Sequence, residues 1–269
     1  MQTISSHNYR ILKWFNIFLG FRPLSAIAVL YYVQVTGSFT LTTTLFFIAS
    51  VGSSVLEIPT GVLSDFLGRK KTIILGTLAI VAAMFSYVLA DSFLLLALGA
   101  GFEALAAALY SGNNDALLYE SLKQDSKTES YSDYFGKIGS LASISAGLAA
   151  LASGFIANID FVYVAWVSAG TAVLALIISL FIIEARAHTE KIESNIFSHL
   201  KEAFIEFKKN AKLRNLTITS TLDWGLGGFA NQFQPAFIAT LWPVWAIGIA
   251  KSFESVAYAA TGWFSGKIL

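Results

Sequence analysis

The chain has 269 residues, of which 55% are hydrophobic and 13% are charged, with a net charge of +1. A soluble domain carries about 25% charged residues, so this composition indicates a protein that faces lipid rather than water. The near-neutral charge argues against nucleic acid as a partner. The absence of cysteine excludes disulfides, thiolate nucleophiles and cysteine-bound metals.

Six apolar segments follow one another in the first part of the chain, and each is long enough for a membrane-spanning helix of about 20 residues. They lie at 14–34, 40–63, 72–90, 92–112, 138–158 and 161–183. Charges inside them are limited to Arg22, Glu57 and Glu103. After a polar stretch, 216–240 and 247–269 predict a seventh and an eighth span. The sequence therefore predicts an all-α, multi-pass membrane protein with at least eight spans.

The basic residues fall on one side of these predicted spans. Of the 18 Lys and Arg residues, 15 lie before the first span or in the connections after the second, fourth and sixth. The intervening connections contain none. Because Lys and Arg concentrate in cytoplasmic loops, the N-terminus and the central loop are predicted to be cytoplasmic. The expected location is the plasma membrane, which in a bacterium is the inner membrane.

The polar stretch between the sixth and seventh spans has a helical pattern of its own. Its apolar residues recur at helical spacing among charged ones; they are Ile196, Phe197, Leu200, Phe204 and Phe207. This predicts an amphipathic cytoplasmic helix, with a solvated linker as the alternative. The expected division of the chain is a six-helix domain, this linker and the start of a second membrane domain, at 1–184, 185–214 and 215–269.

A polar motif stands between the second and third spans. It runs from Gly61 to Lys71 as Gly-Val-Leu-Ser-Asp-Phe-Leu-Gly-Arg-Lys-Lys. Gly61 and Asp65 are one helical turn apart and share a face. Gly68 permits a tight turn, and the basic run from Arg69 to Lys71 fixes the loop in the cytoplasm.

This motif resembles the signature loop of the major facilitator superfamily, whose pattern is G-x-L-[AS]-D-[RK]-x-G-R-[KR]-[KR]. The match includes Gly61, Asp65, Gly68, Arg69 and Lys70, whereas Phe66 stands where a basic residue is usual. The resemblance implies an all-α helical bundle that transports by alternating access. It also implies that the loop acts as a latch. Its aspartate would contact the second half of the protein in one state.

The resemblance further implies that the first arginine of the loop, here Arg69, pairs with an acid at the cytoplasmic end of the fourth span. Asp115 and Glu120 are the acids available there. Asp115 is the expected partner. The alternative is that both acids simply face the cytosol.

Two charges lie at nearly one depth inside the predicted spans. Arg22 lies about 13 Å from the cytoplasmic edge and Glu103 about 17 Å from the outer edge, at 1.5 Å per residue. An ionisable residue in a span is costly to bury and is a candidate for function. The resemblance implies that the first and fourth spans both line the central cavity, so we expect Arg22 and Glu103 to form a cavity pair, in which protonation of Glu103 frees Arg22 and couples protons to substrate. A static ion pair between the two spans is the alternative.

The predicted seventh span carries a polar stripe that includes Asp223, Asn231 and Gln232. The resemblance implies that this span lines the central cavity, so these residues are expected to contact substrate or ion. Hydrogen bonding between helices is the alternative. Two features of drug–proton antiporters are missing. No arginine stands near Ala100 in the fourth span, and no proline occurs between Gly147 and Gly154 in the fifth.

The predicted function is secondary active transport, as proton-coupled efflux of small, drug-like molecules. The alternatives are uptake of a sugar or metabolite by symport, a transporter-like membrane sensor, or a non-functional fragment. The expected partners are the lipid bilayer, a small-molecule substrate and protons. No cofactor or metal is expected, and no enzyme activity, because all three histidines lie outside the predicted spans.

The sequence ends where a second signature loop would open, so a C-terminally incomplete protein lacking about four helices is expected.

Overall fold

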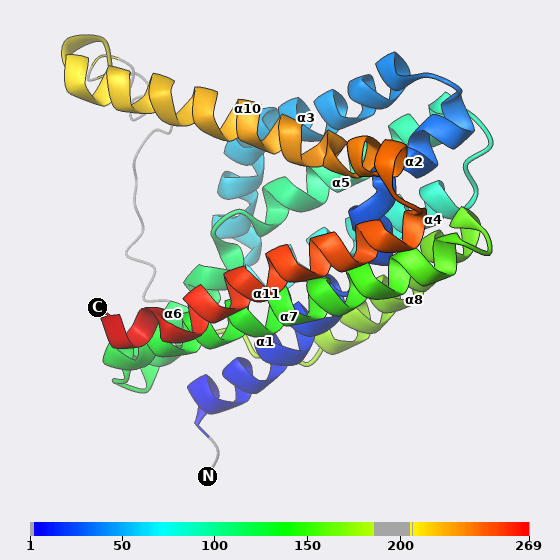
Figure 1. Cartoon of the computed structure of the whole chain (residues 1–269). Coiled ribbons are helices and arrows are strands. Elements are labelled where there is room, and N and C mark those ends of the chain that lie inside the picture. The colour runs from blue at the N-terminus through cyan, green and yellow to red at the C-terminus, as the bar shows by residue number, and fades with distance from the viewer. Residues whose placement is uncertain (1–2, 186–204, 206, 269) are drawn as a thin grey trace. The chain divides into compact units, whose positions relative to one another are not determined.

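The computed structural model describes residues 3–185, 205 and 207–268. These residues form α-helices and one short 3-10 turn, without a strand among them, so the predicted all-α fold is confirmed. Figure 1 shows the helices, whose bounds are α1 Ile4–Gly20, α2 Pro23–Thr36, α3 Phe39–Leu67, α4 Arg69–Val88, α5 Phe93–Tyr110, α6 Asn113–Gln124, α7 Tyr131–Ala157, α8 Phe161–Ser179, α10 Ala211–Leu241 and α11 Val244–Ile268. The 3-10 turn is Thr128–Ser130.

The first predicted span is divided into two helices, α1 and α2. Phe21 and Arg22 separate them, and Pro23 begins α2. Proline suits this position because its missing N–H is not needed in the first turn. Gly20, at the end of α1, lies so close to α7 that a Cβ atom would be 2.9 Å from the Ala142 carbonyl oxygen. The break therefore places Arg22 at the start of a helix rather than in the middle of one.

The fourth predicted span is also divided, into α5 and α6. Ser111 and Gly112 form the break, and Gly112 has a φ of +70°, which favours glycine. The chain then continues as α6, a shorter helix with more polar residues. The break brings the acids of α6 to the end of the apolar segment.

Six segments among the described residues are long and apolar enough to cross a membrane. They correspond to the first six predicted spans, and the two divided spans count as one segment each, Ile4–Thr36 and Phe93–Gln124. The seventh and eighth predicted spans form the helices α10 and α11, which are not among the six. Their insertion in the membrane stays a prediction.

The chain divides into two compact units. One comprises Met1–Arg186 with Pro235–Leu269, and the other comprises Ala187–Gln234. The predicted amphipathic helix at 185–214 lies mostly outside the described residues. The predicted division of the protein into two membrane domains stays a prediction.

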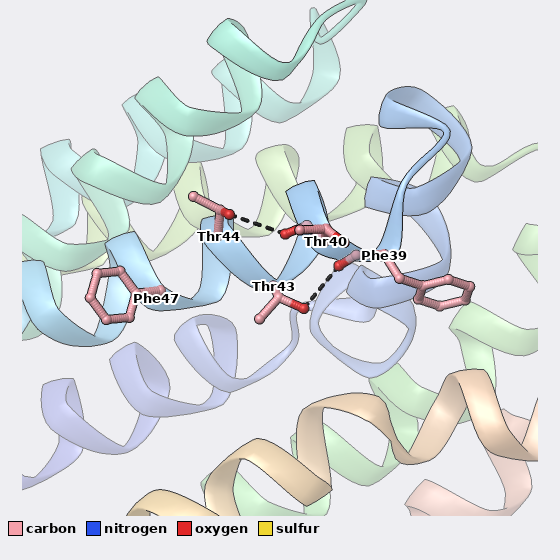
Figure 2. Close-up of a pocket in the computed structure, with 5 residues that line it drawn as sticks. All are labelled: Phe39, Thr40, Thr43, Thr44 and Phe47. Atoms are coloured by element: carbon pink, nitrogen blue, oxygen red, sulfur yellow. Dashed lines mark hydrogen bonds between the residues drawn. The ribbon is translucent and has the colours of Figure 1, made fainter.

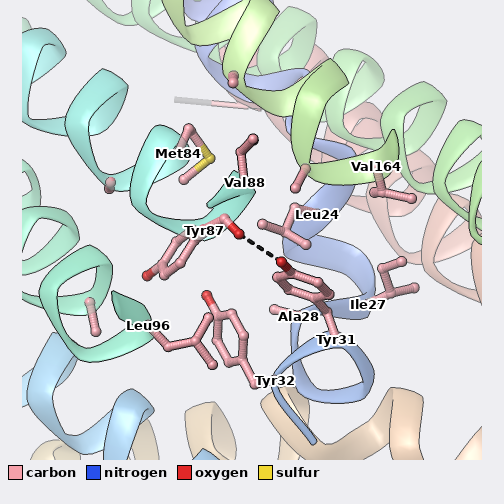
Figure 3. Close-up of a cluster of buried hydrophobic side chains, with 14 of the residues drawn as sticks. Leu24, Ile27, Ala28, Tyr31, Tyr32, Met84, Tyr87, Val88, Leu96 and Val164 are labelled. Carbon is pink, nitrogen blue, oxygen red and sulfur yellow. Dashed lines mark hydrogen bonds between the residues drawn. The ribbon is translucent and has the colours of Figure 1, made fainter. Parts of the chain in front are cut away.

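The larger unit has its main core where α2, α4, α5 and α8 meet. Figure 3 shows this core, in which aromatic side chains of α2 and α4 face each other. Tyr31 donates a hydrogen bond to the carbonyl oxygen of Tyr87 at 2.6 Å, and the rings of Tyr32 and Tyr87 lie 5.3 Å apart. A smaller buried cluster joins α1, α4 and α6 around Leu12 and Ile73.

Helix α11 lies along α7 in the same unit (Figure 1). Small residues allow the two backbones to approach closely. A Cβ atom on Gly248 of α11 would lie 2.4 Å from the carbonyl oxygen of Ala150, and one on Gly154 of α7 would lie 2.7 Å from that of Trp245. The small residues between Gly147 and Gly154 thus serve helix packing, as their composition predicts.

Candidate functional site

The structure brings Arg22 and Glu103 together, as expected. Arg22 precedes the first residue of α2 in the broken first span, and Glu103 lies in α5. Their Nη1 and Oε1 atoms are 3.2 Å apart, and 26% and 32% of the two side chains are exposed. Burying either charge alone inside a span would be costly, and the pair lowers that cost for both. The role of the pair in transport stays a prediction.

Tyr87 completes this site from α4. Its hydroxyl donates a hydrogen bond to Oε2 of Glu103 at 2.9 Å, so each carboxylate oxygen has a donor. The tyrosine ring is held closely, because a Cβ atom on Gly99 of α5 would lie 2.3 Å from it. The backbone of Tyr87 also accepts the hydrogen bond from Tyr31. The three-residue set of Arg22, Tyr87 and Glu103 is called the membrane cluster below.

The arrangement of the membrane cluster permits one specific chemical change. A proton added to Oε1 of Glu103 would remove the negative charge opposite the Arg22 guanidinium. Arg22 would then be left without a carboxylate and could bind a substrate group or turn towards another acceptor.

A second group of polar contacts is built on the signature loop. Gly68 separates α3 from α4 and has a φ of +88°, where residues with a side chain are strained. The carboxylate of Glu184, beyond the end of α8, accepts hydrogen bonds from the backbone amides of Arg69 at 2.8 Å and Lys70 at 2.9 Å. Glu184 thereby satisfies two of the free amides at the start of α4.

The Arg69 side chain reaches several partners in this group. Its Nε is 3.3 Å from Oε1 of Glu120, and its Nη1 donates to the Ser64 hydroxyl at 2.8 Å and to Oδ1 of Asn113 at 3.0 Å. Its Nη2 is 3.6 Å from Asp65, a side chain that is 70% exposed. Ser64 also donates a hydrogen bond to Asn113. Arg69 with these partners and Glu184 is called the loop cluster below.

The prediction that Arg69 pairs with Asp115 is wrong. The structure pairs Arg69 with Glu120 rather than with Asp115. The two acids are five residues apart and therefore about 140° apart around α6. Asn113 and Glu120 share the face towards Arg69, while Asp115 lies beside α1 and α7. Helical periodicity places Glu120 on the same face as Asn113, but only the folded chain shows that this face meets Arg69.

The other expected site residues have different surroundings. Gly61 is an exposed residue of α3, and a Cβ atom there would contact nothing within 4 Å. Asn231 and Gln232 are exposed on α10, and Asp223 belongs to the same helix. These three belong to the smaller unit, so their place in a cavity stays a prediction.

A hollow of about 390 Å³ occurs on the surface of α3. Figure 2 shows that its lining side chains come from this one helix, among them Phe39, Thr43 and Phe47. The hydroxyls of Thr43 and Thr44 donate to carbonyl oxygens within the helix, at Phe39 and Thr40. No polar groups from separate elements converge there, so this hollow is not the candidate site.

Sequence reasoning missed Tyr87, Asn113, Ser64 and Glu184 as members of the two clusters, and it named Glu120 only as the second choice for Arg69. Tyr87 lies in an apolar segment, where an aromatic residue is usually part of a core. Glu184 lies in the connection after the sixth span, which is rich in Lys and Arg, and no motif there singles out an acid. Only the folded chain brings these residues to their partners.

Comparison with known proteins agrees with the all-α fold. A family model for the Major Facilitator Superfamily matches residues 14–269. No curated protein matches the chain.

Proposed function

The chain belongs to the major facilitator superfamily of membrane transporters, and we propose that it works as a proton-coupled exporter of small, drug-like molecules. A membrane transporter of this family implies contact with lipid and a small-molecule substrate. To family membership the proposal adds that transport is outward, that protons are the coupling ion and that the substrates are small, drug-like molecules. It also places the protein in the plasma membrane with a cytoplasmic N-terminus, as the distribution of Lys and Arg favours.

The observation that carries the proposal is the membrane cluster. Glu103 is an acid within an apolar segment, and it contacts both a cation and a hydroxyl. A carboxylate that binds a proton there changes the charge opposite Arg22 without any change in the protein's covalent structure. The partial exposure of both side chains favours a role in binding over a sealed structural ion pair.

The loop cluster supports alternating access as the mechanism. It connects the ends of α3, α4 and α6 with the segment after α8 through one arginine and one capping carboxylate. Such a cluster holds helix ends in a fixed arrangement until its contacts break. We propose that Gly61, Asp65, Gly68, Arg69 and Lys70 form the gate, with Glu120 in place of Asp115 as the acid that binds Arg69.

The proposal is tested by flux measurements with the purified protein in liposomes. A panel of lipophilic cations, sugars and amphipathic acids is loaded, and a pH gradient is imposed in either direction. We expect export of one class of substrate to depend on the gradient. Glu103→Gln is expected to abolish this dependence, while Glu129→Gln, a change in the turn before α7, keeps it.

Different outcomes separate the alternatives. Uptake of a sugar or metabolite together with protons would favour symport and contradict export. Export with an unchanged dependence on pH in Glu103→Gln would contradict the role of the membrane cluster. A complete lack of flux with every compound, in liposomes that contain folded protein, would favour a sensor.

A further inference from the structure

Basic and aromatic side chains meet where the first turns of α1 and α7 lie side by side (Figure 1). The rings of Tyr9 on α1 and Tyr134 on α7 are stacked, with their centroids 4.1 Å apart. The Nζ atom of Lys13 lies 4.8 Å from the centre of the Tyr9 ring. Lys137 follows Tyr134 by one turn and interacts electrostatically with both tyrosines. These four residues, called the lysine–tyrosine patch below, belong to neither of the two clusters.

The patch has more positive than negative charge. Lys137 forms an ion pair with Asp133, in which Nζ and Oδ2 are 2.7 Å apart. Lys13 has no carboxylate partner among the residues that the structure describes. In the same part of the chain, the hydroxyls of Tyr9 and Tyr134 have no hydrogen-bond partner. Two ammonium groups, one carboxylate and two available hydroxyls therefore suit an anion with a single charge and several acceptor oxygens.

The patch lies at the level where lipid headgroups are expected. Lys13 and Lys137 directly precede the apolar segments 14–34 and 138–158, and each segment is long enough to cross the hydrocarbon core. Lysine and tyrosine side chains at the ends of such segments extend to the interface. Trp14, beside Lys13, is 53% exposed, and tryptophan is enriched at membrane interfaces. The groups that suit an anion are therefore close to the phosphates of the bilayer.

Helix α7 continues from the patch with an exposed apolar surface. Ile144 and Leu148 follow Lys137 by about two and three turns, so they share its face of the helix, and both are exposed. A free phosphate ion would use the charged groups alone. A phospholipid would use the same groups and also cover the apolar side chains with its acyl chains. An anionic phospholipid therefore fits this surface better than a free anion.

We propose that the lysine–tyrosine patch binds the phosphodiester headgroup of an anionic phospholipid. The phosphate oxygens accept hydrogen bonds from the ammonium groups of Lys13 and Lys137 and from the hydroxyls of Tyr9 and Tyr134. The single negative charge of the lipid balances the excess positive charge of the patch. A zwitterionic lipid binds more weakly, because its own cation is repelled by the lysines. This binding does not depend on the proposed direction of transport or on the coupling ion.

Thermal unfolding of the purified protein in detergent micelles tests the binding. Phosphatidylglycerol and phosphatidylcholine with the same acyl chains are titrated in parallel. Because a ligand of the folded state raises its stability, we expect phosphatidylglycerol to raise the unfolding midpoint about 2–4 °C more than phosphatidylcholine does. Lys13→Gln and Lys137→Gln should each increase the half-saturating fraction of phosphatidylglycerol about fivefold, the effect of one basic residue near an anionic surface.

Three further variants distinguish this site from a general attraction between lysines and anionic lipid. Tyr134→Phe keeps the stacked ring and the charge but removes a hydroxyl, so the half-saturating fraction should rise about threefold. Asp133→Asn removes the carboxylate that competes for Lys137 and should lower that fraction. The control is Lys123→Gln, which removes an exposed cation from the last turn of α6 and should keep the wild-type value.

Equal midpoints in the two lipids would overturn the proposal, and so would equal losses in Lys123→Gln and Lys13→Gln. An unchanged half-saturating fraction in Tyr134→Phe would also contradict it, because charge alone would then explain the preference. If inorganic phosphate produced the same rise as phosphatidylglycerol, the patch would be a site for a free anion rather than for a lipid. Lipid binding without any flux would leave this site standing while the proposed transport function fails.

Discussion

The membrane cluster and the loop cluster are both built on an arginine at the start of a helix, but they differ in how many partners that arginine has. Arg22 has a single carboxylate partner, Glu103, which Tyr87 also contacts. Arg69 has the acids Asp65 and Glu120 as well as two uncharged acceptors. The comparison teaches that loss of one partner should cost more stability in the apolar segment than at its end.

The largest effect is expected from Glu103→Gln, because this change leaves Arg22 without a carboxylate inside a span. We expect a loss of about 1–3 kcal/mol in the free energy of unfolding, less than for a fully buried pair because both side chains are partly exposed. The double variant Arg22→Gln/Glu103→Gln should recover part of that loss. Denaturation of the purified protein measures both, with Glu129→Gln as the control. A double variant less stable than either single variant would contradict the pairing.

The next effect concerns the fit of Tyr87 against α5. Gly99→Ala places a Cβ atom 2.3 Å from the buried tyrosine ring, so the ring must move away from Glu103. We expect a cost of about 1–3 kcal/mol from overpacking. Gly101→Ala is a matched control on the same helix, because a Cβ atom there contacts nothing within 4 Å. It should be neutral or stabilise by about 0.5–1 kcal/mol. Similar losses in both variants would show that the ring is not tightly held.

Only part of the two clusters could be predicted from the sequence. The depth of Arg22 and Glu103 could be counted because helical rise is uniform, and the structure joins them. The acid that binds Arg69 could not be chosen by position in the chain alone. Its identity depends on the rotation of α6 after the break at Gly112, which the apolar pattern does not record.

The same limit applies to helix ends and to long-range caps. The sequence predicts one first span, whereas the chain breaks it before Pro23 and extends α1 back to Ile4. Glu184 is 115 residues from Arg69 in the chain, and nothing local indicates that it caps α4. Apolar patterns locate spans, but contacts between spans depend on how the helices pack.

A smaller effect is expected in the loop cluster. Glu184→Ala removes the acceptor for two amides at the start of α4, and loss of such a cap costs about 0.5–2 kcal/mol. Hydrogen exchange should become about five- to tenfold faster at the amides of Arg69 and Lys70. Glu129→Ala serves as a control that leaves these amides unchanged. Unaltered exchange in Glu184→Ala would mean that Arg69 and its side-chain partners hold the loop without the cap.

The smallest effect concerns a similar carboxylate cap at the start of α1, where the backbone amide of Ser5 donates to Asp125 at 2.7 Å. Hydrogen bonding by the Ser5 side chain, aided by this amide, lowers the pKa of Asp125 below its usual value. The stabilisation is therefore present above the pKa of the unfolded chain, about 3.9. It is lost as the pH falls through the lower pKa of the folded protein. Asp125→Asn should reduce the acid sensitivity of the unfolding midpoint below about pH 4, whereas Glu129→Gln should not. An identical pH profile in Asp125→Asn would show that this cap contributes no stability that depends on the charge of Asp125.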